Sequence, residues 1–322
     1  MKNVAIICGG LSSEFDISLL SAATIIEHFP KEFTCHKIIV KNDGWWLSKE
    51  DEAFPLDLNT FTANLNGQKI HFDFAMIYIH GFPGEDGKIQ AYLDILNIPY
   101  LNSGALSSEL SFDKWFCNQF LKPFDIPVAT SVLLLNKDEN TDDEIIKQVG
   151  LPCFVKPTDS GSSYGITKVK TTEELRKAIY YAFDEGDSVI IESFLDGKEV
   201  TCGVYRAPNK IITLPLTEIV AEGEYFDYAA KYQGKSQEIT PARISKEETL
   251  KVQHLTERIY KILRLRSIAR IDYIIVGGEP FLVEVNTTPG FSPASLVPQQ
   301  LACAGIKISD FLRQIIKAEL SI

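Results

Sequence analysis

Three oxygen-bearing side chains lie on two neighbouring predicted strands in RIDYIIVGGEPFLVEVNTTPG (270–290). Glu284 and Asn286 are two positions apart, so both point to one face of their strand. Asp272 can reach the same face from the strand that precedes the short Gly-Gly turn. Hard oxygen ligands that converge in this way suit Mg²⁺, which keeps several waters and shares phosphate oxygens. A plain exposed polar face is the alternative, but the valines between these residues make the opposite face apolar.

A glycine-rich stretch, KPTDSGSSYG (156–165), follows the apolar strand pattern CFVKP. Its backbone N–H groups suit phosphate oxygens, and Lys156 either adds a compact charge there or ends its strand in solvent. The stretch is not a Walker A loop, because G-x-x-x-x-G-K-[ST] is absent and a strand pattern follows. We therefore expect a loop between two antiparallel strands that folds over a ligand, with an ordinary hairpin as the alternative. A serine nucleophile is disfavoured, because no G-x-S-x-G elbow is present and no histidine lies near in sequence.

Two further segments join an apolar strand pattern to glycines. In GGLSSEFDISL (9–19) a diglycine precedes a helix N-terminus, which favours an anion or a carboxylate. Glu14 lies at that helix start, where an ordinary first-turn acid that complements the helix dipole is the alternative. In HGFPGEDGKIQ (80–90), His80 ends a strand and can line a cleft at the carboxyl ends of parallel strands, or make a structural hydrogen bond.

The elements that must position these residues alternate in the first hundred residues. Apolar runs at 4–8, 37–41 and 74–79 predict buried strands, and helical periodicity follows the first of them and covers 88–96. This order predicts a small parallel α/β layer.

The rest of the chain predicts antiparallel sheets. After a turn and a helix within 101–124, strand patterns lie at 132–135 and 153–157, and a Thr-x-x-Glu cap begins a helix at TTEELRKAIYYAF. Further strands are predicted in KEVTCGVYR, KIITLPLTEIV, ARIDYIIV and PFLVEVN, with one long helix at roughly 246–264. The segment AEGEYFDYAAKYQGKSQEITPA (221–242) has no period, and a loop this long is more often functional than not.

Composition limits the class of protein. A chain of 322 residues predicts two or three domains. Acidic residues number 43 against 32 basic ones, which argues against a nucleic-acid partner. No run of 18 apolar residues is present, so we expect no membrane partner. The six cysteines are scattered without C-x-x-C or zinc spacing, which favours buried, reduced thiols and a cytoplasmic location.

Taken together, these segments resemble the D-alanine–D-alanine ligase family of ATP-grasp enzymes over nearly the whole chain. The matching pieces keep the family's order and are GGLSSEFDIS, HGFPGEDG, LSFDK, FVKPTDSGSSYG, FDYAAKY, ARIDY, EVNTTPG and SLVP. The resemblance implies mixed α/β and α+β class and a three-domain ATP-grasp fold. The implied domains are an N-terminal α/β substrate-binding domain (1–102), a central domain with the glycine-rich loop (103–187) and a C-terminal domain with the metal site and a long lid loop (188–322).

The implied reaction joins two D-alanines with hydrolysis of ATP to ADP and phosphate, for peptidoglycan precursor synthesis. ATP phosphorylates the carboxylate of the first D-alanine, and the amine of the second attacks the acyl phosphate. The implied cofactors are ATP and two Mg²⁺ ions, with Mn²⁺ as a substitute, and dimers are common in the family.

The resemblance also implies a role for individual residues. The ATP site would consist of Lys114, Lys156, Glu192, Leu195, Glu199 and Lys231, and the metal ligands would be Asp272, Glu284 and Asn286. The substrate site would consist of Glu14 and His80 for the first D-alanine, Ser295 and Leu296 for the carboxylate of the second, and Arg270 with the Gly290 N–H for the tetrahedral intermediate.

Glu14, Ser162 and Tyr232 would form a hydrogen-bonded triad that closes a lid over the acyl phosphate and excludes water. The Lys-Tyr of FDYAAKY favours an amine acceptor, and a D-alanine–D-lactate or D-alanine–D-serine ligase is the alternative. A nucleotide-dependent binding protein without turnover would not need the complete set of candidate charged residues. Another ATP-grasp ligase, such as a carboxylase component, would need other N-terminal motifs.

Overall fold

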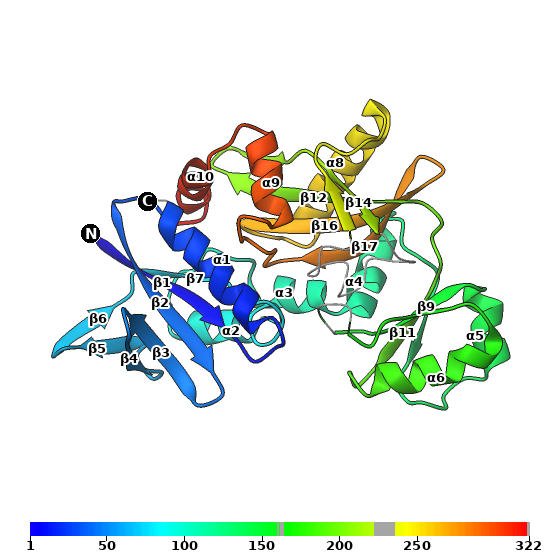
Figure 1. The fold of residues 1–322 in the computed structure, drawn as a ribbon, viewed down its shortest axis with the longest axis horizontal. Coiled ribbons are helices and arrows are strands. Elements are labelled where there is room, and N and C mark those ends of the chain that lie inside the picture. Colours follow the sequence, from blue (N-terminus) through cyan, green and yellow to red (C-terminus); the bar gives the residue numbers. More distant parts are fainter. Residues whose placement is uncertain (160, 162–163, 222–235, 321–322) are drawn as a thin grey trace.

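The computed structural model describes residues 1–159, 161, 164–221 and 236–320, and three sheets follow one another along the chain (Figure 1). The first sheet has the strand order β6-β5-β4-β3-β2-β1-β7. Its strands are β1 (Lys2–Gly9), β2 (Phe33–Lys41), β3 (Gly44–Lys49), β4 (Glu52–Asp57), β5 (Thr62–Leu65), β6 (Gln68–His71) and β7 (Phe74–Ile77). The helices of this region are α1 (Phe15–His28) and α2 (Lys88–Ile95).

The parallel α/β layer predicted from the sequence is confirmed for part of this sheet. β1 pairs in parallel with β2 and β7, whereas β3 to β6 extend the sheet as an antiparallel meander. The meander was not predicted, because its strands are short and two of them, β4 and β6, are largely exposed.

The second sheet has the antiparallel strand order β10-β9-β11-β8. It consists of β8 (Ser131–Leu134), β9 (Cys153–Pro157), β10 (Thr167–Val169) and β11 (Val189–Ser193), with α5 (Asp142–Val149) and α6 (Thr172–Phe183). Thr171 and Glu174 form the predicted capping box of α6. The expectation that the glycine-rich stretch joins two antiparallel strands is confirmed, because β9 and β10 pair in that sense.

The third sheet has the order β15-β14-β12-β16-β17, with β13 paired to β12. Its strands are β12 (Lys198–Ala207), β13 (Lys210–Thr213), β14 (Thr217–Ala221), β15 (Ser236–Ile239), β16 (Ile268–Val276) and β17 (Glu279–Asn286). The remaining helices are α3 (Ala105–Phe112), α4 (Lys114–Leu121), the 3₁₀ helix η1 (Lys122–Phe124), α8 (Lys246–Ile262), α9 (Leu296–Cys303) and α10 (Ile308–Leu320).

The single helix expected within 101–124 is two helices. Asp113 breaks them apart, because its backbone is extended and its side chain accepts a hydrogen bond from the Phe116 N–H at 2.8 Å. An aspartate in this geometry is a preferred N-cap, and it starts α4 in a new direction.

The first and third sheets share one hydrophobic core, although they lie far apart in the sequence. Val4 and Ile6 of β1 belong to the same cluster as Tyr205 of β12 and Phe311 of α10. Figure 1 shows α10 beside α1 at the junction of these two parts. The four-stranded sheet instead packs its own cluster against α5 and α6. The fold therefore consists of one large body and a smaller lobe.

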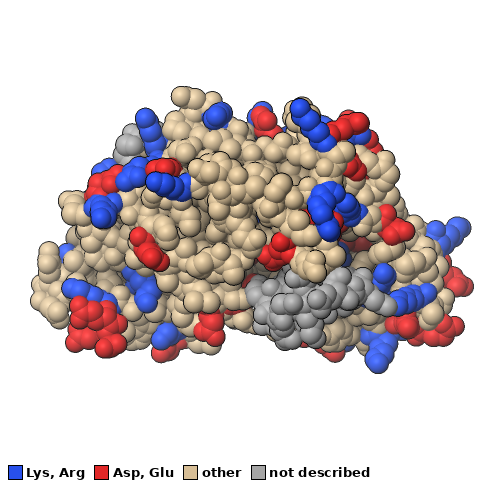
Figure 2. Space-filling model, turned by 45° about the horizontal axis from the view of Figure 1, so that its top comes forward, with Lys and Arg blue, Asp and Glu red and all other residues tan. Residues whose placement is uncertain are grey.

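The surface carries charges of both signs. Figure 2 shows Lys and Arg interspersed with Asp and Glu over the visible face. In the part of the chain that the structure describes, no helix is long and apolar enough to cross a membrane. The six cysteines are free thiols and four of them are buried as expected, whereas Cys35 is half-buried and Cys303 is exposed.

Phe311→Ala should destabilise the large body by about 3–5 kcal/mol, because it opens a cavity in the shared core. The ring is fully buried and lies 5.7 Å from Phe291 and 5.0 Å from Tyr205, centroid to centroid. Urea unfolding measures the loss. Phe116→Ala is the control, since that side chain is 63% exposed and its removal should change little. Equal midpoints for the two variants would contradict the shared core.

Candidate active site

A cavity of about 470 Å³ lies where the three sheets meet. Every predicted site residue that the structure describes lines it: Glu14, His80, Lys114, Lys156, Glu192, Leu195, Glu199, Arg270, Asp272, Glu284, Asn286, Gly290, Ser295 and Leu296. The three other predicted residues, Ser162, Lys231 and Tyr232, lie outside the described residues. The structure therefore brings together residues from segments up to 282 positions apart (Glu14 to Leu296), and their chemical roles stay predictions.

The predicted metal ligands face one another across β16 and β17. Asp272 is paired with Glu284, and Arg270 with Asn286, so all four side chains share the cavity face. Arg270 donates to both oxygens of Asp272, from Nε to Oδ1 at 2.9 Å and from Nη2 to Oδ2 at 2.8 Å. Asn286 Nδ2 lies 3.1 Å from the same Oδ2. Two carboxylates and an amide thus form a cluster of hard oxygen donors that fits Mg²⁺.

Backbone geometry sets this arrangement. Gly277 and Gly278 turn the chain between β16 and β17 with positive φ angles of 59° and 84°, which glycine adopts at little cost. The strand register shifts between Asp272 and Tyr273, and such a bulge re-aims side chains next to functional sites. Thr201 on the neighbouring β12 donates its hydroxyl to Asp272 Oδ1 at 2.5 Å. Asp272 is therefore held from both neighbouring strands.

A second charged group lies on the four-stranded sheet. Lys156 Nζ is 2.7 Å from Glu192 Oε2, and both side chains are largely buried. Asn118 of α4 donates from Nδ2 to Glu192 Oε1 at 3.0 Å, so both oxygens of this carboxylate are fixed. The Lys114 backbone N–H donates to the Thr158 carbonyl at 2.9 Å, which ties the start of α4 to the beginning of the glycine-rich stretch. These contacts place a cation and a carboxylate at one end of the cavity.

Apolar side chains line the cavity beside this group. They come from both antiparallel sheets and adjoining segments, and they are Ala129, Phe154, Ile166, Leu195, Ile274 and Leu282. A slot that joins an apolar wall to a few fixed polar groups suits a flat heterocycle such as a purine.

His80 is engaged by the protein on both ring nitrogens. Nδ1 lies 2.9 Å from the Thr288 carbonyl, which can only accept, so Nδ1 carries the proton. Nε2 lies 3.2 Å from the hydroxyl of Ser21. Burial lowers the pKa of His80, which favours this neutral ring. The structural hydrogen bond that the sequence analysis held as an alternative is therefore present, and the predicted substrate role stays a prediction.

Glu85 is a buried acid that the sequence analysis did not single out. It accepts hydrogen bonds from the Gly81 N–H at 2.9 Å and the Thr288 N–H at 3.2 Å, and it lines the cavity. Burial, with a smaller contribution from the charge of Glu14, raises the pKa of Glu85 to about 7, although the two backbone hydrogen bonds oppose this rise. Its position inside the motif HGFPGEDG could have marked Glu85 as a site residue. Nothing in the sequence around Asn118 or Thr201 marks them as partners of Glu192 and Asp272.

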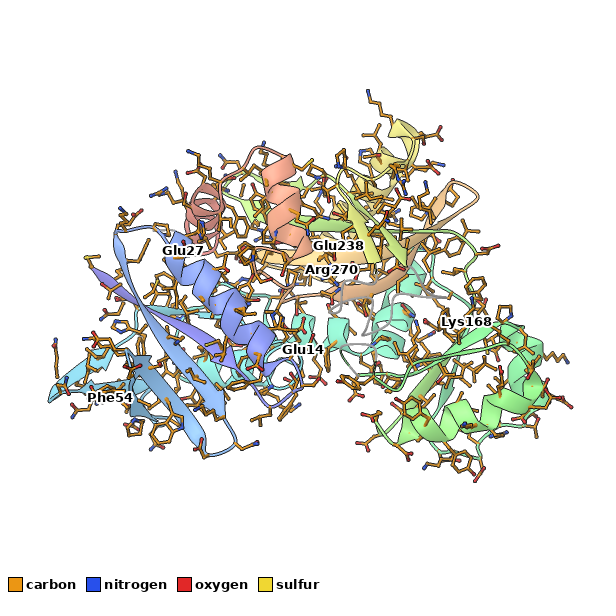
Figure 3. The ribbon with its side chains drawn as sticks, viewed as in Figure 1. Glu14, Glu27, Phe54, Lys168, Glu238 and Arg270 are labelled. Atoms are coloured by element: carbon orange, nitrogen blue, oxygen red, sulfur yellow. The ribbon has the colours of Figure 1, made fainter. Side chains whose placement is uncertain are left out.

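Glu238 of β15 is a second acid that the sequence analysis missed. It lies within the segment 221–242, and Gln299 of α9 donates from Nε2 to its Oε2 at 2.8 Å. Figure 3 shows Glu238 beside Arg270, while Glu14 approaches from the start of α1. Burial raises the pKa of Glu238, and the Gln299 hydrogen bond and the charge of Arg270 oppose this rise.

Two antiparallel sheets meet at one charged cavity, and a sheet with a parallel α/β part precedes them in the chain. This arrangement defines the ATP-grasp fold. Family models described as D-ala D-ala ligase N-terminus and D-ala D-ala ligase C-terminus match residues 3–103 and 120–317. The chain belongs to the D-alanine–D-alanine ligase family.

Individual relatives agree over the full length. A D-alanine–D-alanine ligase of Parabacteroides distasonis is 48% identical over 99% of this chain and 98% of its own. D-alanyl-alanine synthetase A of Vibrio cholerae is similar in structure, with a TM-score of 0.89 and 31% identity over 100% and 99% of the two chains. VanG D-Ala:D-Ser ligase of Enterococcus faecalis has a TM-score of 0.88 and 29% identity over 99% of both. A Bacillus anthracis D-alanine–D-alanine ligase complexed with ATP has a TM-score of 0.79 and 27% identity over 100% and 98%.

The raised pKa of Glu85 predicts a pH-dependent loss of stability. Below its ordinary pKa of 4.5 the carboxyl is protonated in both states, and as the pH rises through about 7 the folded state must bury a charge. The free energy of unfolding of the wild type should therefore fall relative to that of Glu85→Gln between pH 5 and pH 8. Denaturant unfolding across this range measures it. Parallel curves for the two proteins would show that Glu85 titrates normally.

Proposed function

We propose that the protein is an ATP-dependent ligase that joins two D-alanine molecules through D-alanyl phosphate, giving D-alanyl-D-alanine, ADP and phosphate. The observation that carries this proposal is the cavity, which gathers the fixed Lys156–Glu192 pair, the Asp272 cluster and the Glu14 helix start at one place. Full-length relatives named for this reaction support it. The dipeptide would enter peptidoglycan synthesis, and we place the enzyme in the cytoplasm, where ATP is made available.

ATP would bind between the four-stranded and six-stranded sheets. Glu192 and Leu195 would contact the adenine in the apolar slot, and Glu199 the ribose. Lys114, Lys156 and Lys231 would neutralise phosphate charge, which is the main task of a protein in phosphoryl transfer. The likeness to the Bacillus anthracis ligase complexed with ATP supports this assignment. We retain residues 103–187 and 188–322 as the two ATP-grasp domains, behind an N-terminal substrate domain of residues 1–102.

Asp272, Glu284 and Asn286 would hold two Mg²⁺ ions, for which Mn²⁺ can substitute, and which would neutralise charge on the phosphoryl group when bound. The rest of the chemistry depends on side chains and backbone groups of this chain. Glu14 would bind the ammonium of the first D-alanine, near the loop that carries His80. Arg270 would stabilise the negative charge that develops on the tetrahedral intermediate.

Gly290 would contribute its backbone N–H to the same intermediate. A Cβ at this position would lie 3.0 Å from Ser295 Oγ, so the close approach of that hydroxyl favours glycine. Ser295 and Leu296 begin α9, and their side of the cavity would hold the carboxylate of the second D-alanine at the helix N-terminus. Ser162 and Tyr232, with Glu14, would order a lid that keeps water from the acyl phosphate.

The second candidate function is a ligase with D-serine or D-lactate as acceptor. The structural likeness to VanG D-Ala:D-Ser ligase favours considering D-serine. The FDYAAKY segment favours an amine over a hydroxyl nucleophile by its likeness to the amine-using members of the family. A homodimer, which is common among these ligases, stays a prediction.

Phosphate release from ATP and Mg²⁺ should depend on D-alanine and should not occur with L-alanine. A coupled phosphate assay with product analysis measures both the turnover and the dipeptide. D-serine and D-lactate are supplied as competing acceptors in the same assay. Absence of D-alanine-dependent release, or equal release with D-lactate at neutral pH, would overturn the assignment.

Glu284→Gln should lower turnover by at least about 100-fold, because a neutral ligand weakens charge stabilisation worth several kcal/mol. Circular dichroism and the unfolding midpoint should stay unchanged. Glu279→Gln is the matched control, since this exposed residue lies on the same strand and forms a surface ion pair with Lys251. Near-normal activity of Glu284→Gln would remove Glu284 from the proposed metal site.

A further inference from the structure

The proposed reaction requires a protein group that binds the acceptor amine and removes a proton from it. At neutral pH the amine of free D-alanine is an ammonium, which has no lone pair to attack with. Amide formation must remove two protons from this nitrogen, and the departing phosphate can take only one of them as it leaves. A carboxylate near the acceptor nitrogen would both attract the ammonium and accept the other proton. The inference rests on the proposed function, because it concerns the residue that would serve the second substrate.

Glu238 has the position that this task needs. Glu238 of β15 is directly opposite Ile219 of β14, which in turn is opposite Glu199 of β12. Residues directly opposite in neighbouring strands share a face, so Glu238 points to the same side of the sheet as Glu199. Both side chains line the cavity. Glu238 is thus a carboxylate of the active-site sheet face, at the edge nearest α9.

The carboxylate of Glu238 is fixed to the first turn of α9. Gln299 Nε2 donates to Glu238 Oε2 at 2.8 Å and to the Ala294 carbonyl at 2.8 Å. The Gln299 backbone N–H donates to Ser295, the N-cap of the helix. The second D-alanine would place its carboxylate at this helix N-terminus, and its ammonium lies one carbon away from that carboxylate. Glu238 therefore lies beside the expected acceptor nitrogen.

Oε1 of Glu238 is left for the substrate. Among the residues that the structure describes, Oε1 accepts no hydrogen bond, whereas Gln299 occupies Oε2. The other acids that line the cavity already have partners or proposed roles. Glu192 forms an ion pair with Lys156, and Asp272 with Arg270. Glu85 accepts two backbone hydrogen bonds. Glu14 would bind the first ammonium, Glu199 the ribose and Glu284 the metal. Glu238 is the remaining acid of the described cavity lining.

We propose that Glu238 binds the ammonium of the acceptor D-alanine and accepts one of its protons. The nitrogen lone pair then forms the C–N bond at the carbonyl carbon of the acyl phosphate. The C–O bond to phosphate breaks and its electron pair leaves with the phosphate, which takes the second nitrogen proton. The proton on Glu238 passes to solvent after the dipeptide leaves. This assignment gives the enzyme a recognition element for amine acceptors on β15, within the described part of the chain.

The surroundings of Glu238 suit a proton acceptor. Burial raises its pKa, which makes the carboxylate a stronger base than an exposed glutamate. The charge of Arg270 and the Gln299 hydrogen bond favour the ionised carboxylate and so oppose this rise.

The test separates acyl-phosphate formation from use of the acceptor. Hydroxylamine is neutral at pH 7.5, so it captures an acyl phosphate as the hydroxamate without a protein base. Glu238→Gln keeps the shape of the side chain and an oxygen for Gln299. With ATP, D-alanine and saturating hydroxylamine, this variant should form D-alanyl hydroxamate within about twofold of the wild type. Its kcat/KM for D-alanine as acceptor should fall roughly 100-fold, the usual contribution of a general base.

Two controls accompany this variant. Glu238→Asp retains the charge and should recover part of the dipeptide formation. Glu247→Gln changes a glutamate side chain of α8 that is 80% exposed and should alter neither product. Equal loss of hydroxamate and dipeptide in Glu238→Gln would overturn the proposal and make Glu238 a support of the whole cavity. Unchanged dipeptide formation would also overturn it. Failure of the wild type to form either product would instead contradict the proposed function itself.

Discussion

The ion pair between Arg270 and Asp272 is the interaction on which the site depends. Its two hydrogen bonds, at 2.9 Å and 2.8 Å, fix a cation in a sheet face that also carries Glu284, Glu199 and Glu238. Carboxylates gathered this closely repel one another, and a phosphate ligand adds more negative charge. Arg270 offsets part of that repulsion in the protein alone. The repulsion that Arg270 does not offset favours the binding of an anionic ligand together with cations. It also accounts for the lysines that line the cavity from other elements.

The fold supplies these cations from separate bodies. Arg270 belongs to the large body, in which the first and third sheets share a hydrophobic core. Lys156 belongs to the four-stranded lobe, which has its own core. Within this lobe, Lys156 forms an ion pair with Glu192. Asn118, on α4, links the two by its hydrogen bond to Glu192. Any movement between the lobe and the large body would therefore change the distance of Lys156 from the Arg270–Asp272 pair.

Much of this was predictable from the sequence. Strand alternation in VEVN placed Glu284 and Asn286 on one face, and the Gly-Gly turn predicted the pairing that brings Asp272 opposite Glu284. The glycine-rich stretch predicted a connection between antiparallel strands, which β9 and β10 confirm. These predictions succeed because they depend on local periodicity and turn chemistry, which neighbouring residues determine.

The remaining features depend on contacts between distant segments. Glu85 meets the Thr288 N–H, 203 positions away, and Glu238 meets Gln299, 61 positions away. Nothing in the local sequence of Asn118 or Thr201 marks them as partners of Glu192 and Asp272. The antiparallel meander of the first sheet was missed for a different reason, since its exposed strands lack the apolar alternation that marks a buried strand.

The central claim is that ATP activates the carboxylate of the first D-alanine. Incubation with D-alanine labelled with ¹⁸O in its carboxylate tests it directly, with ³¹P NMR of the released phosphate as the readout. The account predicts one ¹⁸O in each phosphate, because the bridging oxygen of the acyl phosphate comes from D-alanine and leaves with phosphorus. Phosphate without ¹⁸O, released while dipeptide forms, would contradict it.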